Sequence, residues 1–243
     1  MEKYAIETSM AKVYCSEMNG RVIDSGLQMM GGYGFIEEYD MARLYRDCRI
    51  DRIWEGTNEI NRQIITGYIM KKSLMEELPI QQAIRDIEKF MSNGMLEDDN
   101  DTLLSESNVV ETSKRLALFL LNEGLCEFGQ DLKHQQQIAD ILANIFMDIY
   151  VAESTILRAK KMLSISSKDS CIEYIAKIFV AEMSQRMILD AEKALKAIYN
   201  GDLSPIIHEQ LNSFRERMYL PTNTLGLKTK IAEYAYLKNG YPY

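Results

Sequence analysis

The segment Ile53-Trp54-Glu55-Gly56 places a carboxylate between an apolar pair and a glycine, just before a stretch with a helical pattern. A carboxylate beside an indole ring loses part of its hydration, which suits it to accept a proton as a general base. Because Gly56 has no side chain, a substrate could approach the backbone there. An acidic residue near a helix start also favours the helix dipole, and spacing alone leaves that plainer role open for Glu55.

Thr57, Asn58 and Glu59 follow this carboxylate at the start of the predicted helix. Thr and Asn are preferred helix caps, and the unpaired N–H groups of a helix N-terminus attract anionic ligands. The three residues therefore predict a helix cap, with or without an anionic group bound beside it.

A second candidate segment is the glycine-rich run Gly31-Gly32-Tyr33-Gly34, which follows a long helical pattern. Glycines allow left-handed backbone angles and leave peptide N–H groups uncovered, so a phosphate or another chain could approach. From the residues alone, a helix C-terminal stop with a sharp reversal is the favoured alternative. It is not a P-loop, because no Gly-Lys-Ser/Thr follows, and not a dinucleotide fingerprint, because no strand precedes it.

Helices must position both segments. Apolar residues at helical spacing predict a helix over 5–30, a shorter one at about 40–50, and a third from Thr57 or Asn58 through Lys72. The polar, acidic residues 92–107 predict a mobile connection. Further helices are expected over 80–91, 108–128, 135–164, 171–199, 204–218 and 223–238. With only 4 prolines and 13 glycines, the sequence predicts an all-α fold of antiparallel helical bundles.

Two motifs together resemble the C-terminal helical domain of the acyl-CoA dehydrogenases. They are GLQMMGGYGF and YRDCRIDRIWEGTNEINRQII, which occur in the family's order and at its usual separation. The stretch MAKVYCSE also resembles the family's helix before the glycine turn, so the resemblance covers about residues 1–72. Because members oxidise acyl-CoA thioesters to trans-2-enoyl-CoA with FAD, the resemblance implies an FAD-dependent dehydrogenase of fatty-acid β-oxidation, acting on long chains.

By this resemblance, Glu55 is the base that removes the proton α to the thioester carbonyl, and Gly56 lies against the substrate. The resemblance also implies a set of FAD contacts, some of them to the cofactor of a neighbouring subunit. The implied cofactor residues are Gln28, Met29, Met30, Gly31, Gly32, Thr57, Asn58 and Glu59. Arg46 and Arg49 are expected to pin the turn through carboxylates such as Asp47 or Asp51.

The resemblance also divides the chain into two parts. Residues 1–75 are expected to be the last part of the dehydrogenase helical domain, an up-down bundle segment. Residues 76–243 are expected to form a second antiparallel bundle, like the extension of very-long-chain members. Because the family's N-terminal and middle domains are missing from this sequence, we expect a fragment that is inactive by itself and holds FAD weakly or not at all. The implied partners are acyl-CoA, an electron-transfer flavoprotein and a second copy in a homodimer.

Composition and charge exclude several other classes. A net charge of −8 argues against a nucleic-acid partner. The four cysteines are far apart and the two histidines have no ligand-like neighbours, so neither a metal site nor a disulfide framework is predicted. Without a membrane-spanning run or a signal-peptide core, a cytoplasmic location is expected. Weak support for contact with a membrane surface comes from a basic cluster, Arg158, Lys160, Lys161 and Lys168.

Two other functions stay open at this point. The chain could be a helical interaction, oligomerisation or membrane-association module with a vestigial dehydrogenase segment, although the intact Glu-Gly-Thr-Asn-Glu run over residues 55–59 favours an enzyme. It could also come from an acyl-CoA oxidase, which shares the general fold and passes electrons to oxygen.

Overall fold

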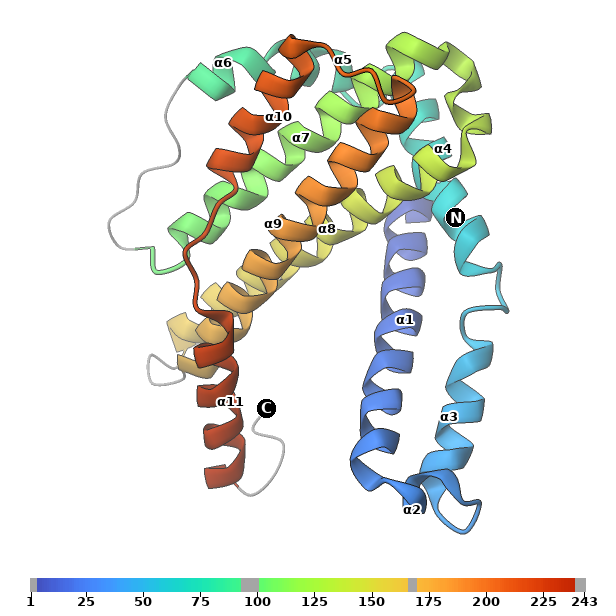
Figure 1. Ribbon diagram of the computed structural model, residues 1–243, viewed down its shortest axis with the longest axis vertical. Coiled ribbons are helices and arrows are strands. Elements are labelled where there is room, and N and C mark those ends of the chain that lie inside the picture. Colours follow the sequence, from blue (N-terminus) through green and yellow to red (C-terminus); the bar gives the residue numbers. More distant parts are fainter. Residues whose placement is uncertain (1–3, 93–100, 166–169, 239–243) are drawn as a thin grey trace. The chain divides into compact units, whose positions relative to one another are not determined.

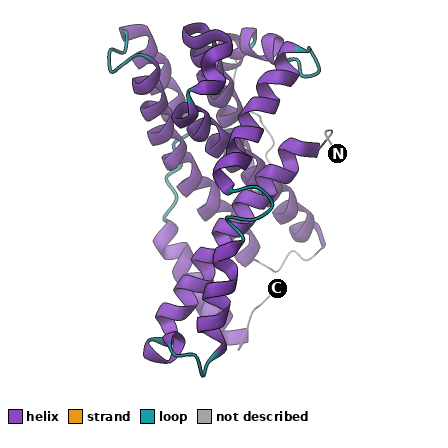
Figure 2. Ribbon diagram, turned by 90° about the vertical axis from the view of Figure 1, so that its right-hand side faces the viewer, coloured by secondary structure: helices purple, strands orange, loops and turns teal. Residues whose placement is uncertain are grey.

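Every regular element in the described part of the chain is a helix, as Figures 1 and 2 show. The computed structural model describes residues 4–92, 101–165 and 170–238, and no strand occurs within these ranges. The predicted all-α fold is therefore confirmed.

The helices form two compact units. Unit 1 contains Met1–Leu78 and Lys133–Met147, and unit 2 contains Pro79–Leu132 and Asp148–Tyr243. Helix α8 (Gln136–Ile165) thus contributes its first turns to unit 1 and its later turns to unit 2. The expected division into two domains, 1–75 and 76–243, stays a prediction.

Unit 1 is built around its longest helix, α1. The complete helices of this unit are α1 (Ala5–Met30), α2 (Gly32–Phe35), α3 (Asp40–Ile50) and α4 (Asn58–Leu74). Helix α1 packs against both α3 and α4. Its residues Ile6, Met10 and Val13 recur every three to four positions and are buried, so one stripe of α1 faces inward. Thr66 on α4 donates a hydrogen bond of 2.8 Å to the carbonyl oxygen of Ala139, which ties α8 to α4.

Unit 2 contains two long helices, α7 and α9, which pack against each other. Its elements are α5 (Ile80–Arg85), α6 (Ile87–Ser92), α7 (Leu104–Phe128), the 3-10 helix η2 (Gly129–His134) at its edge, the later turns of α8, α9 (Ser170–Ile198), α10 (Pro205–Arg217) and α11 (Thr224–Lys238). Leu116 and Leu120 on α7 and Met183 and Met187 on α9 are fully buried. Phe214 of α10 packs its ring 5.7 Å from that of Phe119. Apolar stripes from several helices therefore form the core of this unit.

Two predicted segments differ from the structure. Residues 80–91, expected as one helix, are two short helices that divide at Asp86. The connection expected over 92–107 ends earlier, because α7 already begins at Leu104; residues 93–100 of that connection lie outside the described residues. The start of α7 was placed too late because the residues after Leu104 are polar, which is typical of an exposed connection. Glu106 among them is in fact buried, although its residue type predicts exposure.

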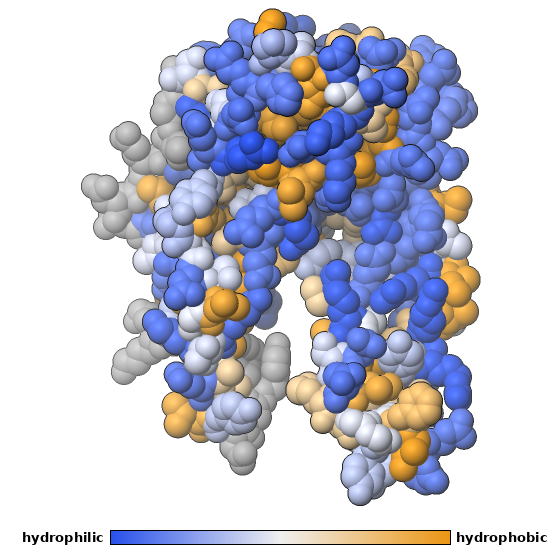
Figure 3. Space-filling view, in the orientation of Figure 1, coloured by the Kyte–Doolittle hydropathy of each residue, from blue (hydrophilic) through white to orange (hydrophobic). Residues whose placement is uncertain are grey.

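The described helices offer little support for contact with a membrane through the basic cluster. None of these helices combines the length and apolarity required to cross a bilayer. In the basic cluster, the ammonium group of Lys160 already donates to Asp101 at 2.6 Å and to Ser107 at 3.0 Å, and Lys168 lies outside the described residues. Apolar side chains gather elsewhere, at the end of unit 1 formed by α2 and the adjoining ends of α1 and α3 (Figure 3), where Phe35 is 76% exposed.

Candidate functional site

The glycine run after α1 forms a sharp turn in which each glycine has its own role. Gly31 ends α1 with a φ of 58°, in the left-handed region that favours glycine. A Cβ atom on Gly34 would lie 2.8 Å from the carbonyl oxygen of Leu27, so only glycine lets α2 approach α1 this closely. At Gly31 and Gly32 no atom outside the adjoining stretch of chain lies within 4 Å of the position that a Cβ atom would take. These two glycines therefore face open space.

The three residues before this turn lie in the last turn of α1, with exposed side chains. Met29 is 82% exposed and Met30 38%, and Gln28 is exposed as well. Together with Gly31 and Gly32 they form a continuous accessible surface, so the structure brings these five predicted cofactor residues together.

The predicted base lies in the turn between α3 and α4. Glu55 has a φ of 53° and Gly56 a φ of 79°, so two successive residues occupy the left-handed region. A non-glycine residue pays about 1–3 kcal/mol of conformational strain there and keeps the conformation only where its surroundings fix it. The carbonyl oxygen of Gly56 accepts a hydrogen bond of 2.8 Å from Nδ2 of Asn61, on the first turn of α4. Such strain is typical of functional turns.

A hollow of about 400 Å³ opens beside Glu55. Its lining residues are Lys12, Cys15, Ser16, Asn19, Asp51, Trp54 and Glu55. The carboxylate of Glu55 is exposed and the Trp54 side chain is 55% exposed. The indole and the carboxylate are therefore adjacent, but the described residues do not enclose the carboxylate in an apolar slot.

The residues at the start of α4 have different environments. Asn58 is only 2% exposed, and its amide nitrogen donates to Oγ of Ser16 at 3.0 Å and to Oε1 of Glu17 at 3.1 Å. Its side chain therefore binds α4 to α1. Glu59 is exposed, and its own backbone N–H and the Thr57 hydroxyl hold the pKa of its carboxyl below the usual value. A negative charge thus stands at the N-terminus of α4, where the helix dipole favours it.

Thr57 caps α4, because its hydroxyl oxygen accepts a hydrogen bond of 3.4 Å from the backbone N–H of Ile60. The Thr57→Ala variant removes this acceptor, so we expect unfolding free energy to fall by about 1 kcal/mol. Urea unfolding of the chain, followed by circular dichroism, measures the change. Thr229, which lies in the interior of α11, provides the comparison: Thr229→Ala should change the free energy by less than half as much, and equal effects would contradict the cap.

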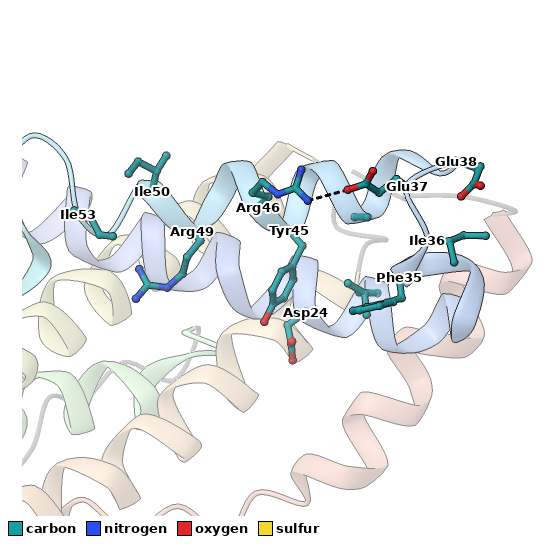
Figure 4. A pocket seen from close by; sticks show the side chains of 12 residues that line it. Asp24, Phe35, Ile36, Glu37, Glu38, Tyr45, Arg46, Arg49, Ile50 and Ile53 are labelled. Carbon is teal, nitrogen blue, oxygen red and sulfur yellow. Dashed lines mark hydrogen bonds and ion pairs between the residues drawn. The ribbon is translucent and has the colours of Figure 1, made fainter.

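Sequence reasoning missed a second groove in unit 1, of about 980 Å³, which Figure 4 shows. Phe35, Ile36, Ile50 and Ile53 give it an apolar lining. At its edge Arg46 donates to Glu37 at 3.1 Å, so Arg46 pairs with a carboxylate as expected, but the partner is Glu37 rather than Asp47 or Asp51. The chain reverses between α2 and α3 and brings Glu37 next to Arg46. Apolar residues on more than one face of 40–50 were the available signal for this groove.

No group of three or more His, Cys, Asp or Glu residues that could hold a metal ion occurs in the described ranges. Beside the strained turn, the hollow brings the exposed carboxylate of Glu55 together with the ionisable side chains of Lys12, Cys15 and Asp51. A glycine-rich turn with an accessible surface lies at the far end of α1.

The fold and the two turns define a class of protein. Residues 1–70 match the family described as acyl-CoA dehydrogenase, C-terminal domain, and residues 112–212 match a second family with the same description. The chain is therefore related to the C-terminal domains of acyl-CoA dehydrogenases over both segments.

Individual relatives agree with this class. The chain is 35% identical over 203 residues to a probable acyl-CoA dehydrogenase of Bacillus subtilis, covering 82% of this chain and 34% of that protein. It is 46% identical over 66 residues to the caffeyl-CoA reductase-Etf complex subunit CarC of Acetobacterium woodii, covering 27% and 17%. A crystal structure of an acyl-CoA dehydrogenase complexed with FAD from Bacillus anthracis superimposes with a TM-score of 0.89 at 30% identity, covering 98% of this chain and 40% of that one. The chain thus spans well under half the length of these relatives.

Proposed function

We propose that this chain is the C-terminal helical part of an FAD-dependent acyl-CoA dehydrogenase, in which Glu55 removes the α-proton of an acyl-CoA thioester. The observation that carries the proposal is the turn at Glu55 and Gly56. Two left-handed residues there present a carboxylate above a hollow, directly before a capped helix. A carboxylate held in one orientation is what proton abstraction next to a carbonyl requires.

The residues present fit FAD at the end of α1. Gly31 and Gly32 face open space, so a cofactor could lie against their backbone, and Gln28, Met29 and Met30 offer amide and apolar contacts beside them. At α4, Thr57 and Glu59 are the accessible members of the predicted set, whereas the amide of Asn58 is already engaged with Ser16 and Glu17. FAD, when bound, supplies the acceptor for the hydride that leaves the β-carbon of the substrate.

The roles of this chain's own residues follow from their positions. An oxygen of the Glu55 carboxylate accepts the α-proton, and the bare backbone of Gly56 leaves room for the thioester beside it. Trp54, which is 55% exposed in this chain, supplies one apolar wall of the hollow. A second surface against Trp54 is required to exclude water from Glu55, because water weakens the electrostatic interactions inside a site.

We further propose that this second surface belongs to the part of the dehydrogenase that the chain does not span. The exposure of Glu55 and Trp54 supports this, together with coverage of only 34% and 40% of the two long relatives. The 243-residue chain alone should therefore be inactive and retain no flavin. We propose further that the substrate is a long-chain acyl-CoA, that the enzyme is a homodimer, and that an electron-transfer flavoprotein accepts its electrons. The Etf complex of the Acetobacterium relative supports the last of these.

The test compares the isolated chain with the complete dehydrogenase that contains it. We expect the complete enzyme to purify with flavin absorbance that palmitoyl-CoA bleaches without oxygen, and the isolated chain to show no flavin absorbance. Absence of bleaching with butyryl-, octanoyl- and palmitoyl-CoA would overturn the dehydrogenase assignment. Stoichiometric flavin on the isolated chain would overturn the proposal that its site is incomplete. Faster bleaching by butyryl-CoA than by palmitoyl-CoA would overturn the proposed preference for long acyl chains. Rapid oxygen consumption would indicate an oxidase instead.

A further inference from the structure

Lys12 connects α1 to the turn that carries the proposed base. It lies 44 residues before Gly56, and its ammonium group donates to the carbonyl oxygen of Gly56 at 2.8 Å. The same group donates to Oδ1 of Asn58 at 2.7 Å. Hydrogen bonds from a charged donor are about twice as strong as neutral ones. One ammonium group therefore ties the end of the turn and the first residue of α4 to α1.

The turn depends on such support because its conformation is intrinsically unfavourable. Glu55 has a side chain that disfavours a φ of 53°, and Gly56 continues the left-handed path at 79°. Rotation of the peptide that carries the Gly56 carbonyl would change both the ψ angle of Gly56 and the path into α4. Two donors hold this carbonyl oxygen, Lys12 from α1 and Asn61 from α4, each at 2.8 Å.

The acceptors of Lys12 are themselves fixed. Asn58 is buried, and its amide nitrogen donates to Ser16 and Glu17, both on α1. Ser16 in turn donates to the carbonyl oxygen of Val13 at 3.1 Å. Lys12 therefore bonds both to Asn58, whose side chain is fixed against α1, and to Gly56, which lies in the strained turn. Through these two bonds the position of α1 constrains the position of the turn.

Lys12 also lines the hollow beside Glu55, so its position bears on the reacting carboxylate as well as on the backbone. Asp51, Asn19 and Ser16 face the same hollow. We propose that Lys12 is a positioning residue for the base: it holds the Glu55-Gly56 turn in the left-handed conformation that directs the carboxylate toward the substrate. This inference rests on the proposed function of Glu55.

The experiment measures flavin reduction by palmitoyl-CoA in the complete dehydrogenase with Lys12→Met. Methionine retains most of the chain length of lysine but donates no hydrogen bond. We expect kcat to fall about 10- to 100-fold, since small displacements of a reacting group have effects of this size. The KM for palmitoyl-CoA and the flavin content should stay within about threefold of the wild-type values, because this role affects proton removal rather than binding.

Two further variants separate positioning from general stability. Lys12→Arg restores a charged donor of similar reach and should recover most of kcat. Lys71→Met, a matched change on the exposed last turn of α4, should leave kcat unchanged. If Lys12→Met does not fold, Lys12→Gln retains a neutral donor and should show a smaller fall in kcat at unchanged KM.

The outcomes distinguish this inference from the proposed function. If wild-type enzyme and Glu55→Gln behave as the dehydrogenase proposal requires while Lys12→Met and Lys12→Gln keep full kcat, only the positioning role is overturned. Equal losses in Lys12→Met and Lys71→Met, or a loss of kcat that follows a loss of flavin, also overturn it. If the wild-type enzyme reduces its flavin with no acyl-CoA, the proposed function fails and the role of Lys12 fails with it.

Discussion

Replacing Glu55 with glutamine is expected to slow flavin reduction by acyl-CoA about 100- to 10,000-fold in the complete dehydrogenase. Glutamine has the same shape as glutamate, but its amide cannot accept the α-proton, and loss of a general base typically has effects of this size. The turn itself should persist, because its backbone is held by Lys12 and Asn61 through the Gly56 carbonyl and not by the Glu55 side chain.

Anaerobic stopped-flow absorbance of the flavin measures this rate directly. The KM for palmitoyl-CoA should change by less than about threefold, because a proton-transfer group contributes to the transition state rather than to binding. Glu7→Gln provides the matched control, since Glu7 is exposed in the first turn of α1, far along the chain from the turn. A Glu55→Gln rate within threefold of wild type would exclude Glu55 as the base.

The second large effect is expected on stability, from Arg62→Met. Arg62 on α4 is only 12% exposed, and its guanidinium group pairs with both carboxylate oxygens of Glu17, at 2.8 and 3.0 Å. Its Nε also donates to Oδ1 of Asn144 on α8 at 2.7 Å. Removing one partner of such a pair leaves a poorly hydrated charge behind, so we expect a loss of about 2–4 kcal/mol in the unfolding free energy of unit 1.

The pH dependence of this loss has a definite sign. Burial by itself would raise the pKa of Glu17, but the hydrogen bonds and charge of Arg62, with help from Asn58, outweigh it and hold the pKa below its usual 4.5. A lowered carboxyl pKa stabilises the folded state above the unfolded-state value and is lost as pH falls through the folded-state value. The difference between wild type and Arg62→Met should therefore be largest near pH 7 and shrink below about pH 4.5.

Asp140, which also faces Arg62, titrates in the opposite sense. Burial raises its pKa more than Arg62 and Asn144 lower it, so protonation of Asp140 favours the folded state as the pH falls. Without Arg62 the lowered pKa of Glu17 should rise, and the raised pKa of Asp140 should rise further. On acidification the variant should thus gain stability relative to wild type. This gain further reduces the difference in unfolding free energy between the two proteins at low pH.

Urea unfolding at pH 7 and pH 4 tests this, with fluorescence of the single tryptophan, Trp54, as the probe of unit 1. Arg46→Met is the matched control, because the Arg46–Glu37 pair is 73% and 81% exposed, and surface pairs of this kind contribute less than about 1 kcal/mol. An equal loss at both pH values, or no larger loss than in Arg46→Met, would contradict the role of Arg62.

The helices could be predicted from the sequence because their signals are local. The 5–30 prediction matches α1, 40–50 matches α3, and Thr57 caps α4 as its residue type indicates. The prediction was wrong where local polarity misled it: Glu106 is buried within α7, and Asp86 divides a segment expected to be one helix. At these positions tertiary packing overrides the local pattern.

The candidate site was only partly accessible to the same reasoning. The motif order indicated Glu55, Gly56 and the glycine turn, and the structure places them in two turns of one unit. The sequence did not reveal that the Asn58 side chain is turned inward to Ser16 and Glu17, or that Arg46 pairs with Glu37. Both depend on which residues the folded chain brings together.

By itself, the sequence determined an all-α chain, the starts and ends of most of its helices, and the resemblance that predicts Glu55 as the base. These depend on periodicity, capping and motif order, which are properties of neighbouring residues. Only the tertiary structure decided the left-handed conformation of Glu55, the exposure of its carboxylate to solvent, and the hydrogen bond that Gly56 receives from Lys12, 44 residues earlier in the chain. The physical reason is that a strained backbone angle and a long-range hydrogen bond exist only when packing of α1 against α4 fixes both partners.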